Sequence, residues 1–247
     1  EWGGKDWTPT QHQIWLDEMQ LASVPEPLTF NSRMVGPVIA EFGSQALKER
    51  FLPPTAALDI WWCQGFSEPE AGSDLASLRT RAVREGDHFI VNGQKVWTSL
   101  GHRADWCQLY VRTDPDVPKH KGISCLIVDM RLPGIEARPL LTLNGAADFA
   151  EVFLHEVRVP AEALLGPLDG GWQVATTTLS HERAGAARLY AAQQLQLADP
   201  ASDDPGRPRQ RLRHFDRSAE HDAVPEPVCG PRQRGAGSSR WMAHPSD

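Results

Sequence analysis

Short apolar segments recur between residues 59 and 168, and turn signals separate them without a helical segment in between. Some alternate apolar and polar residues and others are continuous apolar runs, and both patterns are typical of β-strands. Asn92-Gly93 adds a strong hairpin signal inside one of these segments. Short strands at this spacing predict an antiparallel sandwich or barrel. The predicted strands cover residues 78–84, 88–99, 106–112, 122–129, 134–138 and 151–157.

Apolar residues at helical spacing flank this β-region on both sides. Residues 11–23 and 34–51 precede it, with a stop expected at Phe42-Gly43, a cap at Ser44 and a helix end before Pro53-Pro54. An alanine-rich segment with helical composition follows from Gly170. We therefore predict an α+β chain with N-terminal helices, a middle β-domain and a truncated C-terminal helical domain. The predicted boundaries are 1–58, 59–168, 169–192 and 193–247.

The composition changes after Tyr190. The last 57 residues hold 8 Arg, 7 Pro and 8 acidic residues, but no Ile, Lys, Tyr, Asn or Thr. Two explanations stay open for residues 193–247, namely a genuinely disordered tail and a GC-rich reading frame shifted by one base. In both cases about 190 of the 247 residues look like foldable sequence.

Charge and cysteine usage exclude several classes of protein. The net charge of −7 comes without a basic bias, so nucleic acid is not an expected partner. No apolar run approaches the roughly 20 residues that a membrane span needs. The four cysteines form no CxxC pair, which predicts no metal site and reduced thiols in a cytoplasmic protein. The first residues lack a signal pattern and an initiator Met, so we expect the chain to begin inside a longer protein.

Three segments carry residue types suited to cofactor chemistry. Gln64–Asp74 (QGFSEPEAGSD) is a small-residue loop whose N–H groups and hydroxyls can bind phosphate or the polar edge of a ring. Gly93–Ser99 (GQKVWTS) places the flat side chain of Trp97 beside two hydroxyls. Leu179–Arg183 (LSHER) lies on the predicted C-terminal helix. Taken singly, each has an ordinary alternative: a surface loop, a core tryptophan and a solvated ion pair.

Taken together and in this order, the three segments resemble the acyl-CoA dehydrogenase family. The resemblance runs from about Gly3 to Tyr190 and includes GHRADWCQLYVRTD, GISCLIVDM, FAEVFLHEVRVP and the turn at Gly170-Trp172. It implies an N-terminal helical domain, a middle β-domain and a C-terminal four-helix domain. It also implies that FAD lies between the β-domain and the C-terminal helices.

The resemblance implies roles for particular residues. Ser67 would bond the isoalloxazine ring, Trp97 would lie against it, and Ser73 would contact both the flavin and the CoA side of the substrate. The implied cofactor-binding residues are Gln64, Gly65, Phe66, Ser67, Gly72, Ser73, Trp97, Thr98 and Ser99. The implied substrate-binding residues are Ser73, Ser180, His181, Glu182 and Arg183.

The implied reaction removes a proton from the α-carbon of an acyl-CoA thioester while hydride leaves the β-carbon for flavin N5. A carboxylate in a dry site suits the proton transfer, because burial raises its pKa and makes it a better base. Some family members carry this Glu just before the Arg of the first C-terminal-domain helix, and others carry it much later. Here the first position is Glu182, before Arg183, so Glu182 is the predicted base. Glu68 and Glu70 belong to the flavin loop and are not expected to transfer the proton.

The resemblance also implies partners: an electron-transfer flavoprotein as electron acceptor, and a homo- or hetero-oligomer. No family pattern continues beyond about Ala191, so we expect the chain alone to bind FAD weakly. Three alternatives stay open, namely an acyl-CoA oxidase, a related flavin monooxygenase, and a non-catalytic truncated chain that associates with a partner subunit. Straight fatty acyl, branched acyl and steroid side-chain thioesters all stay open as substrates.

Overall fold

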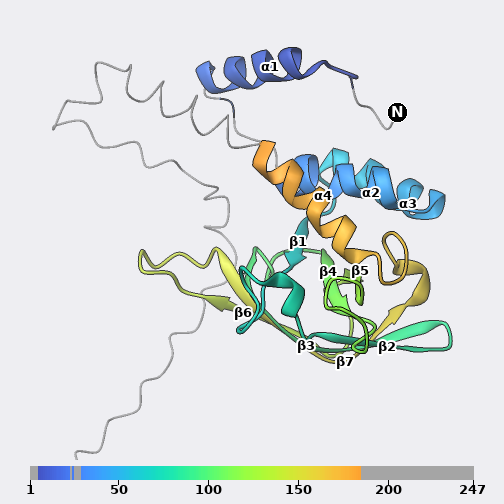
Figure 1. The fold of residues 1–247 in the computed structure, drawn as a ribbon. Coiled ribbons are helices and arrows are strands. Elements are labelled where there is room, and N and C mark those ends of the chain that lie inside the picture. The colour runs from blue at the N-terminus through green and yellow to red at the C-terminus, as the bar shows by residue number, and fades with distance from the viewer. Residues whose placement is uncertain (1–4, 23, 25–28, 185–247) are drawn as a thin grey trace, which may run out of the picture. The chain divides into compact units, whose positions relative to one another are not determined.

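The computed structural model describes residues 5–22, 24 and 29–184. Helices come first, a β-sheet follows, and a further helix ends the described part of the chain (Figure 1). This order confirms the predicted α+β fold. The predictions for residues 185–247, including the tail, lie outside the described residues.

The N-terminal helices agree with the sequence pattern except at their ends. They are α1 (Pro9–Leu21), a π-helical turn (Phe30–Val35), α2 (Gly36–Phe42) and α3 (Gln45–Ala57). Ser44 caps α3, and its hydroxyl accepts from the Leu47 N–H at 3.3 Å.

The predicted helix end before Pro53-Pro54 is wrong, because α3 contains both prolines. Proline removes helix hydrogen bonds but holds a φ that suits a helix. Tertiary packing then carries the helix onward. Thr55 is buried and accepts a hydrogen bond from Trp62 Nε1 at 2.9 Å, and Phe51 packs edge-on against the Trp62 ring.

The sheet has seven strands in the order β1-β4-β2-β3-β7-β6, with β5 paired to β4. The β1–β4 and β2–β4 pairs are parallel, so the antiparallel prediction holds only for the other pairs. All strands fall within residues 59–168, and two short 3₁₀ turns lie at Leu75–Ser77 and Ala161–Ala163. The strands are β1 (Trp62–Gly65), β2 (Arg81–Glu85), β3 (His88–Ser99), β4 (Trp106–Arg112), β5 (Ile123–Asp129), β6 (Ile135–Leu140) and β7 (Phe149–Pro160).

The predicted hairpin at Asn92-Gly93 is wrong, because β3 continues through both residues. The pairing of β3 with β7 shifts register between Val91 and Gly93, which marks a β-bulge. A Cβ at Gly93 would lie 2.5 Å from Thr80 Oγ1 and 2.7 Å from Thr80 Cα. The glycine therefore permits a close approach of two backbone segments rather than a turn.

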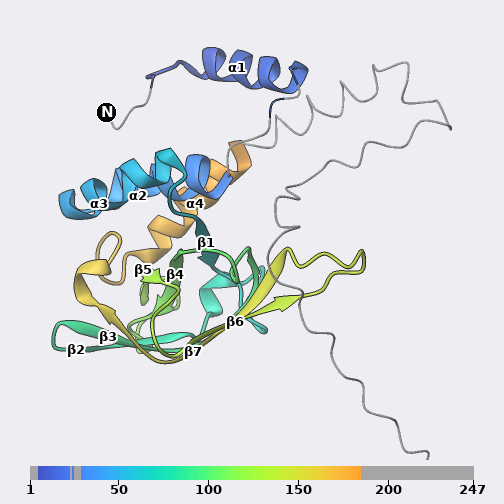
Figure 2. The same cartoon turned by 180° about the vertical axis from the view of Figure 1, so that it is seen from behind.

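Helix α4 (Gly171–Ala184) packs against β5 and the π-helical turn, as the two views of the ribbon show (Figures 1 and 2). Strands β4 and β5 are buried on both faces, which explains their nearly continuous apolar sequences. One face joins a core shared with the helices, including Val38, Phe51, Ile127 and Val174. The other face joins a core between the strands, including Leu109, Leu126, Val152 and Val157.

Candidate functional site

The first predicted cofactor segment leaves the sheet at the end of β1. A pair of backbone hydrogen bonds between Glu68 and Ala71, of 3.0 and 3.1 Å, closes a tight turn. The ring of Phe66 lies 4.4 Å from the ring of Tyr110, measured between centroids. Gly72 and Ser73 follow on the exposed side of the turn. The sequence around Ser67 therefore forms a short loop that is fixed at both ends.

The second segment lies at the end of β3, where a further register shift separates Lys95 from Thr98. Such a bulge redirects side chains, and Trp97 has a positive φ of 58° and a side chain that is 61% exposed. Its ring meets Phe149 edge-on with centroids 5.8 Å apart. The bulge thus presents a large flat ring to the outside instead of burying it in the core.

Both segments also carry hydroxyl groups. Thr98 Oγ1 is buried and has no hydrogen-bond partner in the part of the chain that the structure describes. The hydroxyls of Ser67, Ser73 and Ser99 also make no side-chain hydrogen bond to any described residue. A flat exposed ring beside unused hydroxyls suits an isoalloxazine ring, which has aromatic faces and a polar edge. The described residues therefore fit the implied FAD.

Direct contacts join the two segments. The Val96 N–H donates to the Ser67 carbonyl at 2.9 Å, and Lys95 Nζ donates to the Phe66 carbonyl at 3.0 Å. Lys95 Nζ also forms an ion pair with Glu68 Oε1 at 2.8 Å. Segments that are 27 residues apart in the sequence therefore lie side by side.

The Glu68–Lys95 pair is buried, and its electrostatics follow from that burial. Desolvation opposes ionisation of Glu68, but the charge and hydrogen bonds of Lys95, together with bonds from Thr80 and Arg79, hold the pKa of Glu68 below its usual range. Burial lowers the pKa of Lys95, and Glu68 opposes that shift. The sequence interpretation left both residues without a role. The available signal was a lysine in the middle of a strand, directly before Val96 and Trp97.

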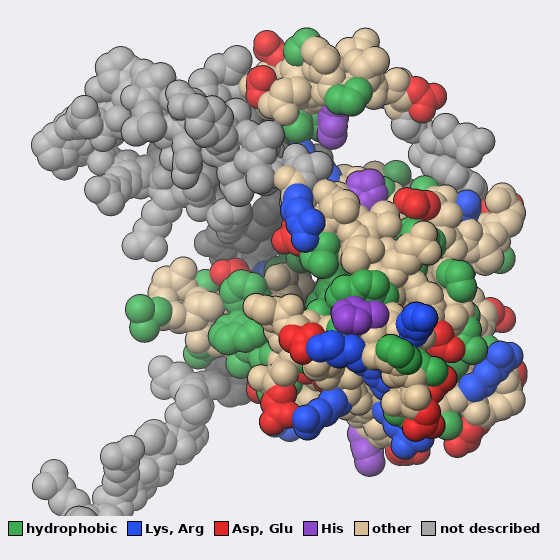
Figure 3. Space-filling view, in the orientation of Figure 1, with side chains coloured by type: hydrophobic (Ala, Val, Ile, Leu, Met, Phe, Trp, Pro, Cys, Tyr) green, Lys and Arg blue, Asp and Glu red, His purple; other side chains and the backbone are tan. Residues whose placement is uncertain are grey.

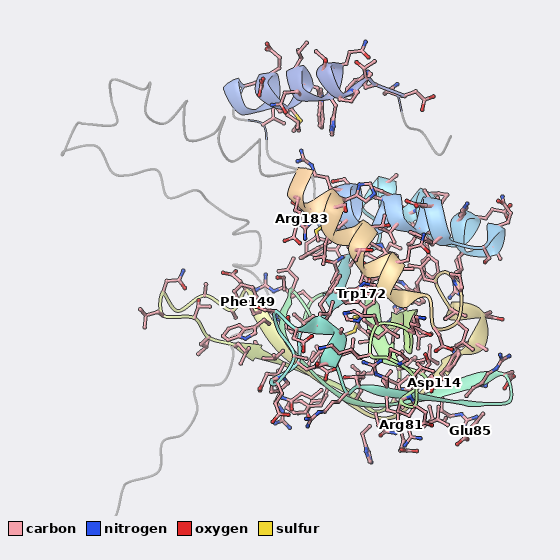
Figure 4. The ribbon with its side chains drawn as sticks, viewed as in Figure 1. Arg81, Glu85, Asp114, Phe149, Trp172 and Arg183 are labelled. Atoms are coloured by element: carbon pink, nitrogen blue, oxygen red, sulfur yellow. The ribbon has the colours of Figure 1, made fainter. Side chains whose placement is uncertain are left out.

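The third segment occupies the last turns of α4. Glu182 and Arg183 are exposed, His181 is half-buried, and the Ser180 hydroxyl donates to the Thr176 carbonyl at 2.8 Å. Figure 4 shows Trp172 near the sheet and Arg183 at the far end of the helix. The dry environment expected for Glu182 is not supplied by residues 5–22, 24 and 29–184.

A buried hydrogen-bond network ties α4 to the sheet. Thr178 Oγ1 receives hydrogen bonds from Gln108 Nε2 and Tyr110 Oη, both at 3.1 Å, and donates to the Val174 carbonyl at 2.9 Å. Gln64 Nε2 in turn donates to Gln108 Oε1 at 2.8 Å. The network therefore begins at a predicted flavin-binding residue. It ends one helical turn before Glu182, on the same side of α4.

A shallow groove of about 480 Å³ lies at the 3₁₀ turn Leu75–Ser77, where Ala76 and Ser77 line it. Four cationic side chains line it, from Arg79, Arg81, Arg112 and Lys119. Lys119 pairs with Asp74 at 2.7 Å and Arg79 pairs with Glu70 at 2.8 Å. The hydrogen bonds of Arg112 go to backbone carbonyls, so its charge meets no hydrogen-bonded carboxylate among the described residues. Figure 4 shows Arg81 at this end of the sheet.

No cluster of three or more His, Cys, Asp or Glu within the described residues could hold a metal ion. No helix among them is long and apolar enough to cross a membrane. Cys63, Cys107 and Cys125 are free and buried, while Cys229 lies outside the described residues.

Most of the described residues match two domains of a known protein family. Residues 63–157 match the acyl-CoA dehydrogenase middle domain, and residues 1–59 match the acyl-CoA dehydrogenase N-terminal domain. The acyl-CoA dehydrogenase FadE29 of Mycobacterium tuberculosis is 46% identical over 194 residues, which cover 78% of this chain and 50% of that protein.

Solved structures show the same likeness. The Tcur3481-Tcur3483 steroid ACAD has a TM-score of 0.72 and 36% identity, covering 83% of this chain and 55% of that one. The ChsE4-ChsE5 complex of Mycobacterium tuberculosis has a TM-score of 0.66 and 42% identity, covering 73% and 46%. The chain therefore spans about half of the length of each of these proteins, between 46% and 55%.

Proposed function

Since this chain belongs to the acyl-CoA dehydrogenase family, we propose that it is a FAD-dependent acyl-CoA dehydrogenase acting on an acyl-CoA thioester. One observation carries the proposal. The fold joins the Ser67 loop and the Trp97 bulge through a 2.9 Å backbone hydrogen bond, and the joined segments carry an exposed ring and unused hydroxyls. Few ligands other than a flavin would need both a stacking surface for a flat ring and several hydrogen-bond donors at the edge of that ring.

FAD, when bound, would supply the acceptor for the substrate hydride. In our proposal the chain's own residues position the ring and the substrate. Trp97 offers a stacking surface, and Ser67, Thr98 and Ser99 offer hydrogen bonds to heteroatoms at the ring edge. Gln64 fixes the start of the loop through its bond to Gln108. Gly65, Phe66 and Gly72 shape the loop between these donors.

The cationic groove at the 3₁₀ turn Leu75–Ser77 supports a CoA thioester as the substrate. The nucleotide end of CoA carries several phosphate charges, and arginines are favoured partners for phosphate. Arg81 and Arg112 lie in the groove, and neither forms an ion pair with a carboxylate in the described part of the chain. Ser73 and the Ser180–Arg183 turn would then hold the thioester end. The likeness to a protein titled a steroid ACAD favours a steroid side-chain thioester over a straight fatty acyl one.

We propose that Glu182 is the base that accepts the proton from the α-carbon of the thioester. Thr178 is held against the sheet, and the residue four positions later projects from the same side of the helix. The Glu182 carboxylate can therefore be turned toward the side on which the first two segments lie. Glu182 and the Trp97 ring are both exposed among the described residues, so water can reach each of them. This exposure supports a second proposal, that the chain alone binds FAD weakly.

The surface next to Trp97 supports an oligomer. Leu141 and Leu143 between β6 and β7 are 78% and 109% exposed, and Figure 3 shows hydrophobic side chains gathered on this projection. Large exposed apolar side chains of this kind mark protein contacts. We propose a further acyl-CoA dehydrogenase-like chain as the partner, an electron-transfer flavoprotein as electron acceptor, and a role in lipid metabolism. The buried free thiols support a cytoplasmic location.

Anaerobic bleaching of bound flavin tests the activity. The full chain with added FAD is titrated with straight-chain, branched and steroid side-chain CoA thioesters, and the visible flavin absorption is followed. We expect bleaching by at least one thioester, its loss in Glu182→Gln, and its retention in Glu162→Gln, which changes another exposed glutamate.

The outcomes separate the alternatives. Full bleaching in Glu182→Gln contradicts the base assignment, whereas bound FAD that no thioester bleaches identifies a non-catalytic chain. Rapid reoxidation by oxygen with release of peroxide would identify an oxidase. A purified chain that carries stoichiometric FAD contradicts the proposal of weak binding.

A further inference from the structure

We propose that Glu68 and Lys95 are a positioning pair that fixes the spacing between the Ser67 loop and the Trp97 bulge. The inference rests on the proposed function, because it assigns the pair a role in holding the flavin. Neither residue is among the predicted cofactor or substrate ligands. The pair lies beneath these ligands and acts through them.

The contacts of the pair converge from three stretches of chain. Glu68 accepts from Lys95 Nζ at 2.8 Å on β3, and from the N–H groups of Arg79 and Thr80 at 2.6 and 2.9 Å. Lys95 Nζ also holds the Phe66 carbonyl at 3.0 Å. Both carboxylate oxygens of Glu68 are therefore used. The loop, the segment before β2 and the strand that carries Trp97 meet at one carboxylate.

The burial of the pair argues for a role beyond stability. Lys95 is fully buried and Glu68 is 8% exposed. An apolar pair of similar volume is often as stabilising as a buried ion pair. An apolar pair would not fix the direction of the loop, because hydrophobic contacts are not directional. The ion pair instead sets a defined distance between two backbone segments that donate groups to one ligand.

The sequence distance strengthens this reading. Ser67 precedes Glu68 by one residue, and Trp97 follows Lys95 by two. The Val96 N–H, which lies between Lys95 and Trp97, donates to the Ser67 carbonyl at 2.9 Å. A change in the length of the ion pair must therefore move Ser67 relative to Trp97, or break the Val96 hydrogen bond.

Two variants of the full chain test the proposal. The double variant Glu68→Gln with Lys95→Met removes both charges and leaves no ion buried alone, so its melting temperature should fall by less than that of Lys95→Met alone, which leaves the Glu68 carboxylate without its partner. Glu68→Asp keeps the charge but shortens the side chain by one methylene. The matched control is Glu136→Gln with Arg138→Met, which removes an exposed ion pair of the same 2.8 Å length from β6.

Two readouts are followed, the affinity for FAD by quenching of flavin fluorescence and the hydrogen exchange of the Val96 amide. Groups that orient the direct ligands of a bound metal typically change affinity by about 10- to 100-fold when they are removed. We expect FAD affinity to fall by about 10-fold or more in both test variants, on this scale. The Val96 amide should exchange faster in both, while the His155 amide, bonded to the Gly134 carbonyl, stays unchanged.

Unchanged FAD affinity and unchanged Val96 exchange in Glu68→Asp and in the double variant would overturn the proposal. If the double variant does not fold, Glu68→Asp alone decides by the same two readouts. If the unaltered chain binds no FAD at all, that result counts against the proposed cofactor. The Val96 amide then decides whether the pair fixes the two segments.

Discussion

Replacement of Thr178 by valine should loosen α4 from the sheet while leaving the helix itself intact. The hydroxyl of Thr178 has one hydrogen, and the Val174 carbonyl at 2.9 Å receives it. Tyr110 must therefore donate its own O–H to Thr178 Oγ1, and Gln108 Nε2 donates a second hydrogen to the same oxygen. Valine would leave both of these buried donors without that acceptor.

The expected cost follows from these two donors. Each unsatisfied buried donor costs about 1–3 kcal/mol. Gln108 Nε2 keeps its other bond, to Tyr110 Oη at 2.9 Å, so the lower end of that range applies to Gln108, and the full range applies to the Tyr110 O–H. The added methyl group returns about 1 kcal/mol of hydrophobic free energy. The net loss should be about 1–3 kcal/mol of unfolding free energy, or roughly 2–12 °C in melting temperature for a folded region of this size.

Thermal unfolding and urea unfolding of the full chain measure the change. Thr177→Val is the matched control, since Thr177 is the neighbouring residue and its hydroxyl makes no hydrogen bond to a described residue. The urea midpoint should fall for Thr178→Val without a change in the slope m, which reports the surface exposed on unfolding. Equal stability of the two variants would refute the claim that this network holds α4 in place.

Two further predictions concern the packing of α4 on β5 and the stability of the chain in acid. Gly171→Ala should destabilise the chain strongly, because the added Cβ would lie 2.6 Å from the Ser124 carbonyl carbon, whereas Gly72→Ala, with nothing within 4 Å, should leave the melting temperature unchanged. Equal melting temperatures for these two variants would contradict the close packing of α4 on β5. Because folding lowers the pKa of Glu68, its contribution to stability is present above the usual value of 4.5 and is lost as the pH falls through the folded value. The unfolding free energy of Glu68→Gln should accordingly fall less steeply below pH 4.5 than that of the unaltered chain. Identical slopes of unfolding free energy against pH would contradict this prediction.

The sequence could predict elements whose signals are local. Helical spacing located α1 and the helices before β1, and turn signals located most strands, because each depends on residues within a few positions. The prediction failed where distant packing overrides a local signal. The Asn92-Gly93 pair stays extended because it pairs with β2 and β7, and Pro53-Pro54 stay helical beside the buried Trp62.

The candidate site shows the same division. Motif positions could point to Ser67, Trp97 and the Ser180–Arg183 turn, since these motifs are contiguous in the sequence. The contacts that hold them could not be predicted, because their partners are 27, 44 and 70 residues apart. No local pattern tells which glutamate a buried lysine will meet, or that Thr178 rather than Thr177 faces Tyr110.

The two supporting networks share the short strand β1 and the loop that follows it. Gln64, the third residue of β1, begins the chain of hydrogen bonds that ends at Thr178, and Glu68, four residues later, anchors the loop to Lys95. Displacement of β1 would therefore move the flavin loop and α4 together. Because both networks are buried, neither can adjust by exchanging partners with water. One network joins β1 to α4 through β4, and the other joins the loop after β1 to β3, so we expect variants in either network to disturb the positions of Glu182 and Trp97 together.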